Sequence, residues 1–110
     1  MEVRWHYCEG NVWCPLMTLN LDFDDEGVYF IWDSIARQVI YVGQGKIAER
    51  LADHRRDRSI QKYNTGSLFV TWAQVPPQSR DGVERYLADY YGPLEGTYHP
   101  RVPPISVNLP

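Results

Sequence analysis

The sequence has few cysteines and no long apolar run. Cys8 and Cys14 are the only cysteines among 110 residues. No segment approaches the roughly 20 apolar residues that cross a bilayer, and the N-terminus lacks the basic-then-apolar pattern of a signal peptide. We therefore expect a cytoplasmic protein, not associated with a membrane, whose two thiols stay reduced.

An excess of positive charge is also missing. The formal net charge is −3, which argues against a general polyanion binder. The charge is uneven, because residues 1–33 hold one basic and seven acidic side chains, whereas residues 46–62 hold six basic and three acidic ones. A basic face at 46–62 is compatible with phosphate contact at one place; a solvated helix with internal ion pairs is the alternative.

A zinc site near the N-terminus is the alternative to buried thiols. His6, Cys8 and Cys14 could supply three ligands, but no fourth is evident and the spacing matches no zinc-finger pattern. Buried thiols are the simpler interpretation.

The chain has no repeats, no low-complexity tract and no internal linker, and its length suits one domain with a single core. We expect that domain to span 1–110, with its core at about 27–93. Residues 1–26 are an N-terminal extension and residues 94–110 a proline-rich tail.

The apolar patterns predict a small α/β domain with a mainly antiparallel sheet flanked by helices. The segments GVYFIW and QVIYV are rich in β-branched and aromatic residues, and the polar stretch DSIAR between them favours a hairpin. The other expected elements are a loose strand at 15–21, a helix at 46–58, a strand at 67–75 and a helix at 79–92.

The hairpin carries two tyrosines. Side chains alternate across a strand, so Tyr29 and Ile31 share a face, and Val39 and Tyr41 are expected to share one in the next strand. A suitable register would bring both phenols to the same side. Cross-strand aromatic packing is the alternative explanation.

The helix that follows carries a basic pair. Arg50 and His54 are four residues apart and share a helical face. Gly43 and Gly45 precede this helix, where unpaired backbone N–H groups would favour an anion. A guanidinium fits phosphate oxygens, and an imidazole exchanges protons near neutrality. Surface pairing with Asp53 or Asp57 is the alternative.

Glu84 has two possible roles. In DGVE, Asp81 and Glu84 have the spacing of a capping box, in which the glutamate serves its own helix start. A lone carboxylate is also a suitable ligand for Mg²⁺, which keeps most of its waters beside a substrate phosphate.

Taken in order, these residues resemble the GIY-YIG nuclease family. GVY (27–29) and YVG (41–43) correspond to the two triplets, Arg50 and His54 follow on a helix, and Glu84 lies on the next helix. The resemblance implies a small α/β endonuclease domain that hydrolyses DNA phosphodiester bonds with one Mg²⁺ or Mn²⁺ ion.

The resemblance also implies roles for the residues. Glu84 would hold the metal and Arg50 the scissile phosphate, while Tyr29 and His54 assist the attacking water and Tyr41 lines the site. The substrate-binding candidates are Gly43, Gly45, Lys46, Arg55, Arg56 and Asn108.

One family position differs. The family usually has an asparagine shortly after the proline that follows the metal glutamate; here Pro93 fits but Gly96 occupies the asparagine's place. Asn108 could replace it if the tail folds back. An inactive nucleic-acid-binding module of the same fold therefore stays open, as does a protein-interaction domain. Branched and single-stranded substrates, an added DNA-binding partner and the oligomeric state also stay open.

Overall fold

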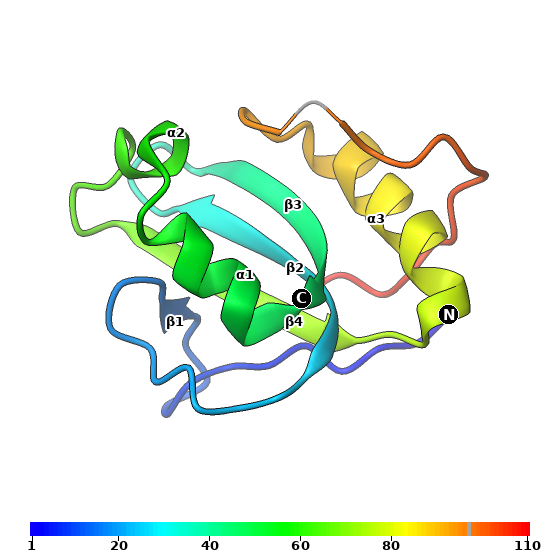
Figure 1. The fold of residues 1–110 in the computed structure, drawn as a ribbon, viewed down its shortest axis with the longest axis horizontal. Coiled ribbons are helices and arrows are strands. Elements are labelled where there is room, and N and C mark those ends of the chain that lie inside the picture. The colour runs from blue at the N-terminus through cyan, green and yellow to red at the C-terminus, as the bar shows by residue number, and fades with distance from the viewer. Residues whose placement is uncertain (97) are drawn as a thin grey trace.

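The computed structural model describes residues 1–96 and 98–110 as a four-stranded antiparallel sheet flanked by helices (Figure 1). The strand order is β1-β4-β2-β3, so β3 is an edge strand. This confirms the predicted α/β class. The strands are β1 (Cys14–Pro15), β2 (Glu26–Asp33), β3 (Gln38–Lys46) and β4 (Leu68–Gln74), and the helices are α1 (Ile47–His54), α2 (Arg58–Gln61) and α3 (Pro77–Tyr91).

The sheet buries both faces, each under a different helix. Tyr29 and Ile31 point toward α1 and join a cluster with Ile47 and Leu51. Val28, Phe30 and Val42 point the other way and join Val83 and Leu87 of α3. The period-2 alternation of β2 therefore separates the two layers.

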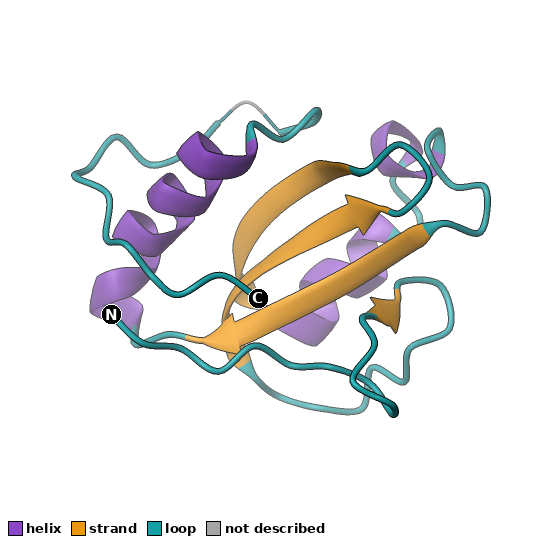
Figure 2. Ribbon diagram, turned by 180° about the vertical axis from the view of Figure 1, so that it is seen from behind, coloured by secondary structure: helices purple, strands orange, loops and turns teal. Residues whose placement is uncertain are grey.

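The chain ends run together behind the sheet (Figure 2). The backbone N–H of Val3 donates to Oδ1 of Asn108 at 2.7 Å, and Nδ2 of Asn108 donates to the Val3 carbonyl at 2.9 Å. The proline-rich tail thus contributes to the fold, with Val107 buried against the α3 side of the sheet.

Two strand predictions need correction. The expected strand at 15–21 reduces to Cys14–Pro15, after which the chain turns. Val39 and Tyr41 do not share a face, because the register shifts so that Tyr41 pairs with Ile31 and Val39 with Trp32. Such an irregularity inserts one residue and reverses the side of those that follow.

The helix predicted at 46–58 is interrupted. Helix α1 ends at His54, and α2 begins after Asp57, whose carboxylate accepts a hydrogen bond from the backbone N–H of Ser59 at 2.9 Å. Aspartate at this position caps the new helix.

The expectation of reduced thiols is wrong, because Cys8 and Cys14 form a disulfide with Cα atoms 5.1 Å apart. A tight turn makes the approach possible: Gly10 and Asn11 have positive φ, and Cys8 bridges to Val12. Since no free thiol remains at these positions, the alternative zinc site loses two of its three ligands. Among the described residues, no helix combines the length and apolar character that a membrane span requires.

Candidate active site

Tyr29 and His54 meet beneath the edge strand. The Tyr29 hydroxyl lies 2.6 Å from Nε2 of His54, and both residues are buried. Tyr29 comes from the middle of β2 and His54 from the last turn of α1. The contact therefore joins the hairpin to the basic helix, as the predicted convergence of these residues requires.

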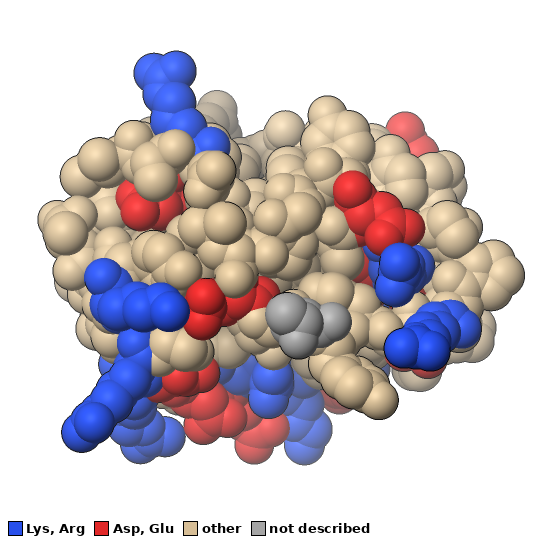
Figure 3. Space-filling view, turned by 90° about the horizontal axis from the view of Figure 1, so that it is seen from above, with Lys and Arg blue, Asp and Glu red and all other residues tan. Residues whose placement is uncertain are grey.

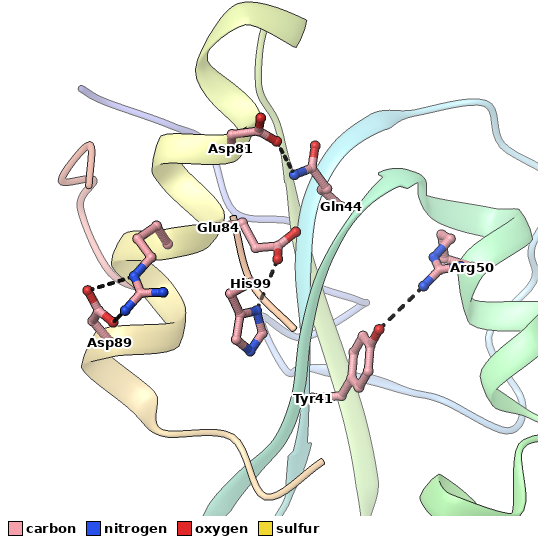
Figure 4. Close-up of polar contacts among 8 residues, drawn as sticks. Tyr41, Gln44, Arg50, Asp81, Glu84, Asp89 and His99 are labelled. Atoms are coloured by element: carbon pink, nitrogen blue, oxygen red, sulfur yellow. Dashed lines mark hydrogen bonds and ion pairs between the residues drawn. The ribbon is translucent and has the colours of Figure 1, made fainter. Parts of the chain in front are cut away.

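Tyr41 and Arg50 lie beside this pair. The guanidinium of Arg50 donates to the Tyr41 hydroxyl at 3.4 Å (Figure 4), and the Tyr29 and Tyr41 rings stack with centroids 6.1 Å apart. The Nε atom of Arg50 is buried and has no hydrogen-bond partner among the described residues. An oriented guanidinium with an unused donor suits an anion.

Burial sets the protonation of this cluster. It raises the pKa of Tyr29 well above the usual range, and although Arg50 opposes the shift, Tyr41 and Glu84 add to it. Burial also lowers the pKa of His54 to about 4, with further help from the Arg50 charge. At neutral pH a protonated phenol therefore faces a neutral imidazole.

Gly43 permits the position of Tyr29. It lies opposite Tyr29 in the hairpin, and a Cβ added to it would lie 2.6 Å from the Tyr29 hydroxyl oxygen. Any larger residue would have to displace the phenol. The close approach of the Tyr29 phenol thus explains why position 43, the last residue of YVG, is a glycine.

Glu84 lies on the inner side of α3, where only 5% of its surface is exposed. Its Oε2 lies 3.0 Å from Nδ1 of His99, from the tail (Figure 4). The capping interpretation is wrong, because α3 begins at Pro77 and Asp81 instead accepts a hydrogen bond from the Gln44 side chain. Glu84 is therefore available for a role outside its own helix.

The candidate residues are grouped around the edge strand. In Figure 4, Glu84 and His99 lie on the α3 side of β3, and Tyr41 and Arg50 lie on its α1 side. The charge of Glu84 nevertheless contributes to the raised pKa of Tyr29, so the carboxylate acts on the buried phenol across this strand. The candidate residues therefore lie on both sides of β3 and do not line a pocket on one face of the sheet.

His99 is the residue that sequence reasoning missed. Its Nε2 atom is buried and has no hydrogen-bond partner among the described residues. The only sequence signal was a third histidine in a tail otherwise dominated by proline and apolar residues. Its position beside Glu84 depends on how the tail folds back.

Asn108 does not reach the site, since its side-chain amide is held by two hydrogen bonds to the backbone of Val3. Nor could an asparagine occupy position 96 in this conformation. Gly96 has φ +73°, and a Cβ there would lie 2.5 Å from the Tyr41 ring. The side chain that the tail supplies beside the carboxylate is His99.

The other predicted substrate-binding residues divide into two groups. Gly45 lies inside β3 opposite Gly27, and the first helical amide, that of Ile47, donates to the Asp25 carbonyl. The predicted open helix N-terminus therefore loses its first amide, while Lys46 adds no side-chain cap to the amides that follow. Arg55 is also unavailable, because its guanidinium donates to the carbonyls of Leu16 and Leu19.

Lys46 and Arg56 are exposed and can meet a substrate, although Arg56 pairs with Asp53 at 3.5 Å. The face seen in Figure 3 carries basic side chains at both ends, with acidic side chains beside them. Charge alone therefore does not define a nucleic-acid surface.

The carboxylate fits a hard cation that needs few protein ligands. No group of three or more histidine, cysteine, aspartate or glutamate side chains suited to a metal ion occurs in the described part of the chain. Glu84 has one oxygen engaged by His99 and the other free of hydrogen bonds to described residues. Such a single carboxylate matches Mg²⁺ or Mn²⁺, which retain water ligands, and not a closed zinc site.

Comparison with known proteins found no match among family models, curated proteins or solved structures.

Proposed function

We propose that this protein is a divalent-metal-dependent endonuclease that hydrolyses phosphodiester bonds in DNA, as its resemblance to the GIY-YIG family implies. The observation that carries the proposal is the grouping of Tyr29, Tyr41, Arg50, His54 and Glu84 around one edge strand. These residues come from β2, β3, α1 and α3, and a purely structural role for one of them would not require the others nearby.

The electrostatic requirements of the reaction are met by two groups. A phosphodiester is an anion, and attack by water adds negative charge in the transition state. Arg50 remains charged at any working pH, and its guanidinium would bind a phosphate oxygen. Its buried Nε donor would become available after the displacement of Tyr41. A cation held by Glu84 would supply positive charge beside the same phosphate.

Tyr29 and His54 would accept the proton that the attacking water loses. In the tautomer that carries its hydrogen on Nδ1, His54 accepts the Tyr29 hydroxyl proton at Nε2. As Tyr29 gives up that proton, its oxygen takes one from the attacking water, so the phenol acts as a relay. Its raised pKa argues against a standing phenolate base.

Access to the phenol requires a small movement. Tyr29 has no exposed surface, whereas Tyr41 is half-buried. The water would reach Tyr29 after a displacement of Tyr41, whose hydroxyl is tied to Arg50. Phosphate binding by Arg50 would release that contact and open the way.

A plasmid assay tests this function. Supercoiled DNA is incubated with a titration of Mg²⁺ or Mn²⁺, and nicked and linear forms are separated on a gel. We expect scission by the wild type, and its loss in Arg50→Ala and Glu84→Ala. Arg4→Ala, at an exposed position away from the site, serves as the charge-matched control. Robust cleavage by both site variants would refute the assignment.

A binding module of the same fold is the second candidate, favoured by the missing asparagine. It predicts salt-dependent DNA binding without scission under any metal. The same assay, paired with a binding measurement, separates the two. A cytoplasmic location stays a prediction.

A further inference from the structure

A polar cavity lies next to the candidate site, between α3 and the tail. It is open to solvent, has a volume of about 290 Å³ and is lined by Arg85, Tyr98, His99 and Arg101. His99 is shared with the candidate site, because its Nδ1 contacts Glu84 while its ring also lines this cavity. A ligand in this cavity would therefore be separated from Glu84, the proposed metal ligand, only by the His99 side chain.

The cavity continues as a groove along α3. A second hollow of about 580 Å³ is lined by Arg85, Asp89, Arg101 and residues 102–104. The two hollows share both arginines. An elongated ligand could thus run from the candidate site along the gap between α3 and the tail.

The two arginines differ in whether an acidic side chain pairs with them. Arg85 is bound by Asp89 through contacts of 3.0 and 3.3 Å. Arg101 is exposed and forms no ion pair with any described residue. Arg101 is therefore the free cation of the groove, while Arg85 adds donors whose charge Asp89 partly offsets.

Tyr98 provides an aromatic surface at the entrance. Its side chain is 96% exposed, the highest value among the large apolar residues of the described chain. A fully exposed aromatic ring contributes little to folding, since it removes almost no apolar area from water. Beside a guanidinium in a groove, it matches the arrangement that proteins use for unpaired bases, in which a ring stacks on the base and cations follow the phosphates.

We propose that Tyr98 and Arg101 form a subsite for an unpaired nucleotide, which places a single-stranded segment of the substrate next to Glu84. This assignment rests on the proposed function and narrows it to DNA with a single-stranded or branched part. A base inside a duplex has both faces covered by its neighbours, so Tyr98 selects the unpaired form. Arg101 binds the adjoining phosphate.

The test is a binding measurement that needs no cleavage. Fluorescence anisotropy in EDTA at low salt compares a labelled 20-nucleotide dT strand, a blunt duplex and a duplex with a single-stranded tail. We expect the wild type to prefer the strand and the tailed duplex. Tyr98→Ala and Arg101→Ala should each weaken strand binding on the order of tenfold, whereas Tyr98→Phe and the control Arg4→Ala retain it.

The outcomes separate this subsite from the nuclease proposal. Plasmid scission together with unchanged strand binding by Tyr98→Ala and Arg101→Ala would overturn the subsite alone. Strand binding that depends on both residues, without any scission, would support the subsite and refute the nuclease. Equal affinity for blunt duplex and single strand, or preference for an acidic peptide of the same length, would also overturn the subsite.

Discussion

The substitution Gly43→Ala tests the geometry under the edge strand most sharply. The new methyl group would lie 2.6 Å from the Tyr29 hydroxyl oxygen and 2.8 Å from its ring carbon Cζ. The phenol cannot move away easily, because Tyr29 is fully buried and its hydroxyl is hydrogen-bonded to His54. Overpacking costs about 1–3 kcal/mol, and a broken buried hydrogen bond adds about 1 kcal/mol. We therefore expect the free energy of unfolding to fall by about 2–4 kcal/mol.

A double-mutant cycle with Tyr29→Phe identifies the cause. The phenylalanine keeps Cζ but removes the hydroxyl oxygen and its hydrogen bond to His54. That hydrogen bond can be lost only once, so the two changes together should destabilise by about 1 kcal/mol less than the sum of the single changes. Urea unfolding of the four proteins supplies the numbers. Additive effects, or a Gly43→Ala protein as stable as the wild type, would refute the close approach of the phenol to the strand.

Three further changes have defined outcomes. His99→Ala should weaken Mn²⁺ binding at Glu84 by about tenfold in calorimetry, since ligand-orienting partners contribute that much, and an unchanged affinity would remove His99 from the site. Folding lowers the pKa of His54 from 6.5 to about 4. The free energy of unfolding should therefore be unaffected by this residue above pH 6.5 and should fall by up to about 3 kcal/mol as the pH falls toward 4. A His54→Gln protein with the same pH profile would contradict this. Reducing the Cys8–Cys14 disulfide, which closes a short loop, should lower the free energy of unfolding by about 2 kcal/mol, and equal urea midpoints with and without dithiothreitol would show that the bond contributes nothing.

The elements of the fold were predictable where local patterns decide them. The β-branched and aromatic runs of β2 and β3 specify strands, and the hydrophobic period of α3 specifies a helix. The disulfide and the register shift near Trp32 were not predictable. Both depend on backbone turns and pairings that join residues without any periodic signal.

The site was predictable only in part. The order of Tyr29, Tyr41, Arg50, His54 and Glu84 follows from the sequence motifs, and the structure groups these residues around β3. The contribution of the tail could not be read from spacing, because it depends on which side chain arrives beside Glu84 after a proline-rich segment folds back. That residue is His99.

The central claim is that one cation bound at Glu84 lies near the phenols and the guanidinium on the other side of β3. Paramagnetic broadening by Mn²⁺ in the NMR spectrum of the protein measures this directly. We predict broadening of the side-chain signals of Tyr41, His54 and His99, and its loss in Glu84→Ala. Broadening confined to the acidic hollow lined by Asp24, Asp25, Glu26 and Glu49, with the aromatic signals unchanged, would contradict the claim.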